Sequence, residues 1–218
     1  MSAVAHIDEY KTGRFYADEF RGASSWNGYE NKVLLRNDGS DAEGLPHFTD
    51  VAMALGADED GDGRGVAAAD FDNDGDLDLA VNHNPGDSGH FERSAAVLLR
   101  NDVGQARHFL AVELRGTRSN RDGVGALVTL EAGGASQLRV VEAGSSYASQ
   151  QSLRLYFGLN DVTSVDRLQV RWPSGQRQSF GPLVADQLVV IEEGGALSVR
   201  SLAGTRPGGA RLAPSGKR

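Results

Sequence analysis

The sequence predicts an all-β protein in which a small blade-like unit precedes an antiparallel β-sandwich. Three observations support this fold class. The chain has 28 glycines in 218 residues and few aromatic residues, a composition that favours short strands and many turns over helices. A six-residue segment occurs twice along the chain. The later part of the chain contains successive short segments in which apolar and polar residues alternate.

The repeated segment lies in the first half of the chain. Val33–Asp38 and Val97–Asp102 have the same sequence at an offset of 64 residues. Each copy is expected to form a short buried strand that runs into an Asn-Asp turn. A repeat of this length is typical of one β-propeller blade of about four strands. Since a propeller takes ~4–8 blades, we expect this single blade to pack on the rest of the chain or on another protein.

The second half of the chain is expected to form the sandwich. In residues 109–114 and 168–172 apolar and polar side chains alternate, as a strand with one buried face requires. The segment Pro173–Gly175 then predicts a tight turn. The predicted strands are Phe109–Leu114, Ala126–Leu130, Gln137–Glu142, Leu153–Phe157, Arg167–Trp172 and Leu188–Ile191. Short strands joined by turns in this way favour an antiparallel sandwich.

The segment 70–78 carries the clearest signal of a binding site. Carboxylates occur at five alternate positions, namely Asp70, Asp72, Asp74, Asp76 and Asp78. A calcium ion takes ~6–8 oxygen ligands, and Gly75 would let the chain turn sharply around such an ion. A solvated acidic turn is the alternative, but carboxylates at this density repel one another unless a cation neutralises them. We therefore expect this segment to bind Ca²⁺.

The acidic segment begins like an EF-hand loop but ends differently. An EF-hand loop carries a bidentate glutamate at its twelfth position. Here that position is Val81, inside the alternating stretch Leu77–Val81, which predicts a strand. The upstream stretch Gly65–Ala69 is small and apolar and has no helix cap. The loop is thus predicted to join two strands, and the predicted fold is a single propeller-like blade with a calcium loop, packed on an antiparallel β-sandwich.

The negative charge of the chain is concentrated around this loop. The formal net charge is −8, and residues 50–78 hold ten acidic residues and one basic residue, a contribution of −9. A nucleic-acid partner is not expected, because phosphate binding requires a basic surface. The sequence has no cysteine, no apolar run of the ~18 residues that a membrane span needs, and no signal-peptide pattern in Met1–Glu9.

Two family resemblances follow from these motifs. The stretch Gly65–Leu79 resembles an FG-GAP/VCBS repeat, the calcium-loop blade of integrin-type propellers. The stretch Val97–Glu193 resembles the ASPIC/UnbV domain, which follows such repeats in the cartilage acidic protein family and its bacterial relatives. The second resemblance rests on four motifs in the expected order, at residues 116–126, 144–150, 157–159 and 170–175.

These resemblances imply a binding protein. They imply that the side chains of Asp70, Asp72, Asp74 and Asp78 and the backbone carbonyl of Asp76 bind the ion. They also imply a periplasmic or secreted protein that acts by binding and not by catalysis. Family members typically carry several blades, whereas this chain has room for one, so we expect it to be a subunit of something larger.

Two further groups of polar residues could bind metals. Asp58, Asp60 and Asp62, followed by Gly63, imitate the start of a second calcium loop, but the closing ligand is missing. We expect these side chains to assist the main site or to face water. His83 and His90 could contribute to a transition-metal site, but no third nitrogen or sulfur ligand is near them in the sequence, which favours solvated loop histidines.

Serines and aromatic residues in the second half have two possible roles. Ser145 and Ser146 could suggest a nucleophile, but the G-x-S-x-G pattern is absent, and turn serines are the preferred interpretation. Four aromatic residues could form a carbohydrate platform, although sandwich core is the preferred role: Tyr147, Tyr156, Phe157 and Trp172.

The sequence thus predicts four segments and a function. Residues 1–30 are expected to be an N-terminal extension, 31–104 an FG-GAP/VCBS-like blade, 105–195 an ASPIC/UnbV-like sandwich, and 196–218 a flexible basic tail. The expected function is that of a non-enzymatic calcium-binding interaction module, or an accessory subunit of a larger extracytoplasmic assembly with a protein partner. An adhesion or carbohydrate-binding protein is the alternative, and a metal-dependent hydrolase is less favoured.

Overall fold

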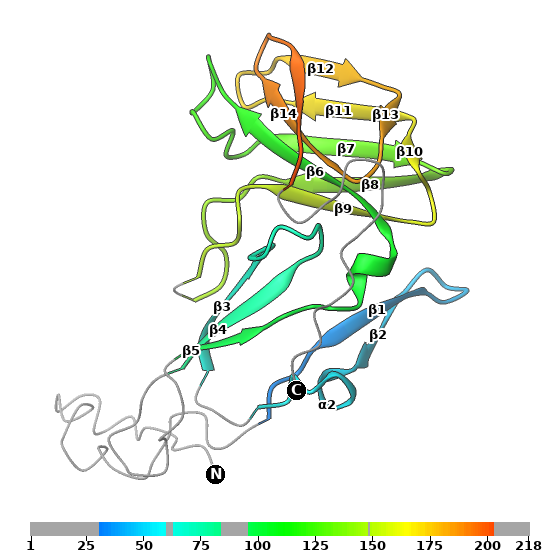
Figure 1. The fold of residues 1–218 in the computed structure, drawn as a ribbon, viewed down its shortest axis with the longest axis vertical. Helices are drawn as coiled ribbons and strands as arrows, with labels where there is room; N and C mark the ends of the chain where they lie inside the picture. Colours follow the sequence, from blue (N-terminus) through cyan, green and yellow to red (C-terminus); the bar gives the residue numbers. More distant parts are fainter. Residues whose placement is uncertain (1–30, 60–62, 84–95, 148, 203–218) are drawn as a thin grey trace, which may run out of the picture. The chain divides into compact units, whose positions relative to one another are not determined.

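The computed structural model describes residues 31–59, 63–83, 96–147 and 149–202 (Figure 1). The predicted N-terminal extension, 1–30, lies outside the described residues, as does 203–218, which makes up most of the predicted tail. Three residues considered as metal ligands also lie outside them: Asp60, Asp62 and His90.

The described part of the chain is almost entirely β-structure, as predicted. Its strands are β1 (Leu35–Ser40), β2 (Pro46–Asp50), β3 (Gly63–Ala69), β4 (Asp78–His83), β5 (Ala96–Leu99), β6 (His108–Arg115), β7 (Leu127–Ala132), β8 (Ala135–Val140), β9 (Leu155–Asn160), β10 (Ser164–Val165), β11 (Arg167–Arg171), β12 (Arg177–Phe180), β13 (Leu183–Val184), β14 (Gln187–Glu192) and β15 (Leu197–Arg200). The described helices are α2 (Ala52–Leu55) and the 3-10 turn η3 (Gly104–Ala106). Neither is long enough to cross a bilayer.

The chain divides into two compact units. Among the described residues, the first unit contains 31–59, 63–66, 81–83 and 96–99, and the second contains 67–80 and 100–202. The division passes through β3 and β4, so the acidic segment 70–78 belongs to the second unit together with the sandwich.

The first unit contains the hairpin formed by β1 and β2. The two strands are antiparallel, from the pair Leu35 and Asp50 to the pair Ser40 and Pro46, with an irregularity between Asn37 and Gly39. All residues of both strands are exposed. The prediction that the first copy of the repeat forms a buried strand is therefore wrong, because none of the described elements of this unit covers either face of the hairpin.

The prediction of a buried strand is also wrong for the second copy, because the residues of β5 alternate between exposed and half-buried. Both copies nevertheless share the same local hydrogen bond and ion pair. In the first copy Asn37 Oδ1 accepts a hydrogen bond from the Gly39 amide at 2.9 Å, and in the second Asn101 Oδ1 accepts one from the Val103 amide at 3.0 Å. The preceding arginine pairs with the following aspartate in each copy. The predicted Asn-Asp turn directly follows β5, whereas β1 continues through it as far as Ser40.

The strands of residues 31–104 form two small sheets. One is the β1–β2 hairpin, and the other is a three-stranded sheet with the order β3-β4-β5. The interpretation of this segment as a propeller blade remains a prediction.

The second unit contains a sandwich of two four-stranded sheets. One sheet has the order β12-β11-β7-β8, and all its neighbours are antiparallel. The other has the order β15-β14-β6-β9 and is mixed, because β14 runs parallel to β6. The prediction of an entirely antiparallel sandwich is wrong at this pair. Parallel neighbours need a long crossover connection, here the strands between β6 and β14, and alternation within a strand does not encode its direction.

The two sheets share one hydrophobic core. Alternate residues of the strands point inward, so Leu110 and Val112 of β6 lie in the same cluster as Val128 and Leu130 of β7. All four are completely buried. The expectation that the aromatic residues build the sandwich core is confirmed for Phe157 and Trp172, which lie in this cluster. Tyr156 is buried in a separate apolar cluster, and Tyr147 is 73% exposed, so the expectation is wrong for these two.

The sandwich extends further towards the C-terminus than the sequence indicated. Leu197–Arg200 form β15, which pairs with β14, and Leu202 is buried in a second apolar cluster. The predicted flexible tail beginning at 196 is therefore wrong over this stretch. Alternation over four residues is too short to distinguish an edge strand from a polar loop, and the same is true of the unpredicted strands β10, β12 and β13.

Candidate metal centre and the surrounding domain

The acidic loop joins β3 to β4, as the sequence predicted. β3 ends at Ala69, directly before Asp70, and Asp78 is the first residue of β4. Asn73 and Gly75 have φ angles of +59° and +102°, the left-handed conformation that asparagine and glycine adopt most readily. These two residues wind the loop back on itself, so that its first and last carboxylates come together.

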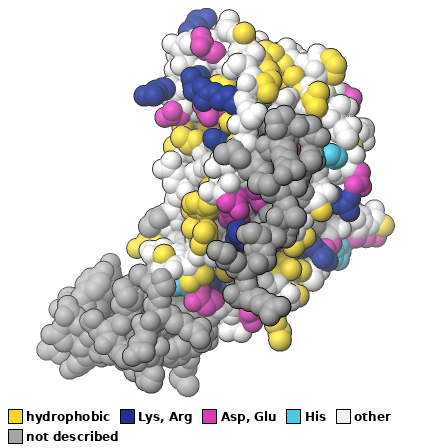
Figure 2. Space-filling model, viewed as in Figure 1, with side chains coloured by type: hydrophobic (Ala, Val, Ile, Leu, Met, Phe, Trp, Pro, Cys, Tyr) yellow, Lys and Arg dark blue, Asp and Glu magenta, His cyan; other side chains and the backbone are white. Residues whose placement is uncertain are grey.

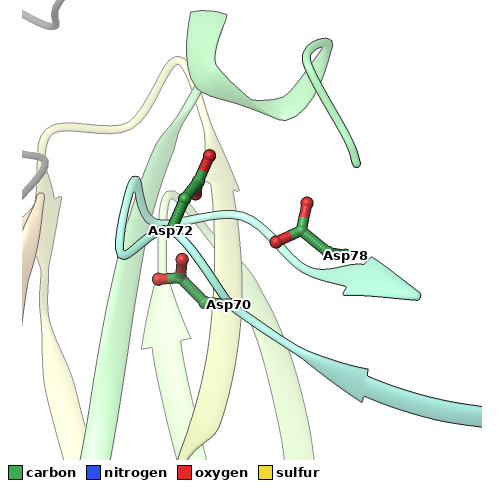
Figure 3. Close-up of side chains that lie close together, drawn as sticks. All are labelled: Asp70, Asp72 and Asp78. Carbon is green, nitrogen blue, oxygen red and sulfur yellow. The ribbon is translucent and has the colours of Figure 1, made fainter. Parts of the chain in front are cut away.

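Three of the five predicted ligands form a cluster. Asp70, Asp72 and Asp78 each offer a carboxylate oxygen, and these oxygens lie within 4.8 Å of one another. Figure 3 shows Asp70 and Asp78 at the adjoining strand ends and Asp72 in the loop between them. Among the described residues this is the one group of three or more acidic or histidine side chains placed close enough to hold a metal ion.

Backbone amides fix two of these carboxylates. Asp70 accepts hydrogen bonds from the amides of Asp74 at 3.0 Å and Gly75 at 3.1 Å. Asp78 accepts them from Phe71 at 3.0 Å and from Asn101 at 2.8 Å. Because each carboxylate oxygen has two lone pairs, these bonds orient the groups and leave capacity for a cation.

The other two predicted ligands lie beside the cluster. Asp74 Oδ1 accepts a hydrogen bond from the Asp76 amide at 3.2 Å. Both carboxylate oxygens of Asp76 are buried, and neither has a hydrogen-bond partner in the described structure. Buried polar atoms are nearly always paired, so an unpaired carboxylate beside other carboxylates is compatible with a cation site at this loop.

The pKa values of the loop reflect its burial and its charge. Burial, followed by repulsion from Asp74 and Asp78, raises the pKa of Asp76 to about 7. The pKa of Asp70 and that of Asp72 are also raised, in both cases chiefly by burial. Each shift means that the ionised loop is disfavoured without a cation, and a bound cation would reverse this effect.

The sandwich supports the loop from the same compact unit. A Cβ atom on Gly75 would lie 2.1 Å from the ring of Phe109 on β6. Only glycine therefore lets the loop backbone lie this close to the ring. Gly104 similarly borders the side chain of Asp76. The hydroxyl of Tyr156 on β9 is hydrogen-bonded to Asp70. The sequence did not indicate that Gly104, Phe109 and Tyr156 contact the loop, because they are far from it along the chain.

The remaining candidate ligands are not brought to this site in the described structure. Asp58 is half-buried in the first unit, and its predicted companions lie outside the described residues. His83 is buried at the end of β4, with Nε2 3.5 Å from a carboxylate oxygen of Glu59. The prediction of a solvated loop histidine is wrong for His83, because β4 carries it into a buried position.

Ser145 and Ser146 lie in a turn, which agrees with the preferred interpretation of them as turn serines. The Ser145 amide donates to the Ser149 carbonyl at 3.2 Å, and Ser146 has a φ of +63°. The hydroxyl of Ser145 accepts a hydrogen bond from Gln151 at 3.4 Å. These contacts account for the two serines as turn residues.

Residues 116–198 match the family model described as ASPIC and UnbV. The chain contains an ASPIC/UnbV domain. The matched segment begins directly after β6 and ends within β15, so it covers most of the sandwich. No curated protein matches the chain. The resemblance of Gly65–Leu79 to an FG-GAP/VCBS repeat remains a prediction.

The ASPIC/UnbV domain contains a buried carboxylate that the sequence did not suggest. Glu193 is 3% exposed, and its Oε2 accepts hydrogen bonds from three successive amides, those of Thr117, Arg118 and Ser119, at 3.0, 2.8 and 2.6 Å. Its Oε1 accepts from the hydroxyls of Ser119 and Ser174. Glu193 thus ties the first and last motifs of the domain together after β14.

Burial and hydrogen bonding act on the pKa of Glu193 in opposite directions, and hydrogen bonding dominates. Burial alone would raise its pKa, but the hydrogen bonds from the Ser119 amide, the Ser174 hydroxyl and the Arg118 amide outweigh it and lower the pKa to about 2. The clustered glycine, serine and threonine donors of the first motif were the only signal in the sequence. They could not identify the acceptor, which lies 74 residues beyond Ser119.

Replacing Gly75 with alanine should disturb the loop. The new methyl group would overlap the ring of Phe109, so we expect Gly75→Ala to lower the free energy of unfolding by ~1–3 kcal/mol. Gly134→Ala is the matched control, because Gly134 also has a positive φ (+78°) but has no atom within 4 Å of the added Cβ. Urea unfolding of both variants measures the difference, and equal losses would contradict the proposed close packing.

Neutralising Glu193 should change the acid stability of the domain. Its folded-state pKa of about 2 is below the ordinary value of 4.5, so its stabilising effect is present above pH 4.5 and is lost as the pH falls towards 2. Glu193→Gln should therefore lower stability at pH 7 and flatten the pH dependence in that window. Thermal unfolding from pH 7 to 2.5 tests this, with exposed Glu142→Gln as the control. An unchanged profile in Glu193→Gln would refute the assignment.

Proposed function

We propose that this chain is a non-enzymatic calcium-binding β-protein that acts as an interaction module or accessory subunit of a larger extracytoplasmic assembly. The observation that carries the proposal is the acidic loop, in which three carboxylate oxygens converge and a fourth carboxylate is buried without a hydrogen bond. Asp70, Asp72 and Asp78 are the proposed central ligands, and Asp74 and Asp76 complete the set.

The chemistry of the loop favours calcium over other metals. All the candidate ligands are hard oxygen donors, which excludes a preference for the metals that bind nitrogen and sulfur. Calcium tolerates irregular geometry and accepts ~6–8 oxygen atoms, which suits a short loop with many carboxylates. Magnesium requires a near-ideal octahedron and retains several water molecules, so it makes less use of such a set.

The proposed role of the ion is structural. An ion at this position would offset the repulsion among the carboxylates and stabilise the loop in its contact with β6. Ion binding would then be coupled to folding, since the unfolded chain does not hold the carboxylates together.

The blade interpretation of residues 31–104 belongs to this proposal. Two observations support it: the asparagine of the repeat accepts the same hydrogen bond, from the amide two residues later, in both copies, and the acidic loop joins neighbouring strands, β3 and β4. An FG-GAP/VCBS-like unit would account for both features.

Exposed apolar side chains support an interaction role for the first unit. Val33, Leu35, Leu45 and Phe48, in or beside the β1–β2 hairpin, are each more than half exposed. An isolated two-stranded hairpin is marginally stable in water, and exposed apolar residues are common at protein interfaces. Hydrophobic side chains are also visible among polar ones on the face drawn in Figure 2. We propose a protein partner that covers this hairpin.

An extracytoplasmic location completes the proposal. Calcium modules outside the cell typically work at dissociation constants of ~10⁻⁴–10⁻³ M, a range in which a partly exposed loop can bind. The location is proposed from the resemblance of the chain to FG-GAP/VCBS and ASPIC/UnbV proteins.

Calcium should stabilise the wild-type protein and act through Asp76. At a hundredfold excess over the dissociation constant we expect a gain of ~2.7 kcal/mol relative to EDTA. Asp76→Asn removes a buried, repelled charge, so it should be more stable than wild type in EDTA and gain less from calcium. Calorimetric melting of both proteins, with exposed Glu142→Gln as the control, measures these opposite effects.

Two results would contradict the calcium site. Equal melting temperatures of the wild type in calcium and in EDTA would exclude a bound ion. An unaltered calcium gain in Asp76→Asn and in Asp72→Asn would place the ion elsewhere in the chain.

The exposed hairpin should be required for capture of the partner. Leu35→Ser with Phe48→Ser should reduce recovery of specific proteins from native extracts, because the apolar contact is lost while folding is unaffected. Val184→Ser is the control, since Val184 is 69% exposed in the second unit. Quantitative mass spectrometry compares the captured proteins. The same set from wild type and the double variant would exclude the hairpin as the interface.

A further inference from the structure

The second unit has a polar pocket, formed by β6 and the ASPIC/UnbV segment, that the proposed calcium site does not use. It has a volume of about 610 Å³ and lies where β6 ends. β9 pairs with β6 with Leu155 opposite Val112, so residues 152–154 lie beside the end of β6, and Glu192 of β14 pairs with Arg115 on the other side. The loop after β6 completes the wall. A volume of this size falls within the range of small-ligand sites.

The charges around the pocket are balanced. Three arginines and three acidic residues line it: Arg115, Arg121, Arg154, Glu113, Asp122 and Glu192. Arg115 and Glu113 are paired at 3.2 Å, which offsets part of this charge. Among the described residues, the side chains of Arg121 and Asp122 have no hydrogen bond or ion pair, so one donor group and one acceptor group are available on the loop.

The loop that carries Arg121 and Asp122 is held rigidly. Upstream, three successive amides bind Glu193. Downstream, Asn120 bridges to Val124, donating to its carbonyl and accepting from its amide, both at 2.8 Å. A loop fixed at both ends loses little conformational entropy on binding, which is the condition for a preorganised site.

Arg154 provides a third polar group with unmet hydrogen-bonding capacity. Its Nη1 donates to the hydroxyl of Tyr156 at 3.1 Å, and its Nη2 lies 3.9 Å from a carboxylate oxygen of Glu113. Its Nε is buried and makes no hydrogen bond within the described structure. An unsatisfied donor in the wall of a pocket is costly, and a small adjustment towards a ligand oxygen would remove that cost.

We propose that this pocket binds a neutral sugar. A sugar hydroxyl both donates and accepts hydrogen bonds, so it can satisfy a carboxylate and a guanidinium side by side, as Asp122 and Arg121 require. An isolated anion would gain little from a lining whose charges cancel. The half-buried side chain of Leu153 offers an apolar contact for the C–H face of the ring.

This inference goes beyond the proposed calcium function and does not require it. The pocket and the acidic loop share one connection, the hydroxyl of Tyr156, which is hydrogen-bonded to both Arg154 and Asp70. Separate substitutions in the loop and in the pocket can therefore distinguish failure of one proposal from failure of the other.

The test is sugar binding by the full chain in calcium-containing buffer. Saturation-transfer NMR against a panel of neutral hexoses, N-acetylhexosamines and their disaccharides identifies a binder, and calorimetry measures its dissociation constant. Arg121→Ala with Asp122→Ala should weaken binding roughly tenfold or more, because each removes a hydrogen bond to a charged group. Arg171→Ala, an exposed position on β11 away from the pocket, is the matched control and should bind as wild type.

The outcomes separate the alternatives. The double variant should keep the calcium-dependent rise in melting temperature, whereas Asp72→Asn should lose that rise and keep sugar binding. Absence of binding to every sugar at 10 mM, on the order of the weakest specific affinities, would overturn the proposal. Equal affinity in the double variant and in wild type would also overturn it. Binding of inorganic phosphate or of a charged peptide in place of sugars, lost in the double variant, would assign the pocket to a different ligand.

Discussion

The close packing of the acidic loop on the outer face of the β15-β14-β6-β9 sheet is the constraint on which the proposed site depends. Gly75 meets the ring of Phe109, and Asp78 accepts a hydrogen bond from Asn101. These contacts bring the loop carboxylates together in a partly buried place, where their mutual repulsion is less screened than in water. The same contacts that fix the loop therefore place its carboxylates where a cation could offset their repulsion.

The ASPIC/UnbV domain contains a second buried carboxylate, that of Glu193, which differs from Asp76 in its hydrogen bonding. Glu193 is satisfied entirely by backbone amides and hydroxyls of its own domain, and its pKa falls, whereas Asp76 has no such donors, and its pKa rises. The contrast follows from hydrogen bonding, since both side chains are removed from water. The paired carboxylate of Glu193 holds two segments of its domain together, whereas the unpaired carboxylate of Asp76 lies beside the candidate metal cluster.

Much of the second unit could be predicted from short-range patterns. The alternating segments gave six strands of the sandwich close to their observed positions, because a strand with one buried face imposes a period of two on its own residues. The strands of two to four residues were missed, since so few positions cannot establish a period. The direction of β14 and the exposure of β1 also escaped prediction, because both depend on which elements lie beside the strand.

The sequence by itself determined the identity of the candidate ligands, the strands on either side of them and the turn chemistry of the repeat. Only the tertiary structure decided that Asp70, Asp72 and Asp78 converge, that Asp76 is left without a donor, and that Glu193 closes on a loop more than 70 residues before it. The physical reason is the sequence separation over which each kind of interaction acts. Spacing along a chain fixes contacts within a turn or a strand, whereas burial and pairing depend on residues that only folding brings together.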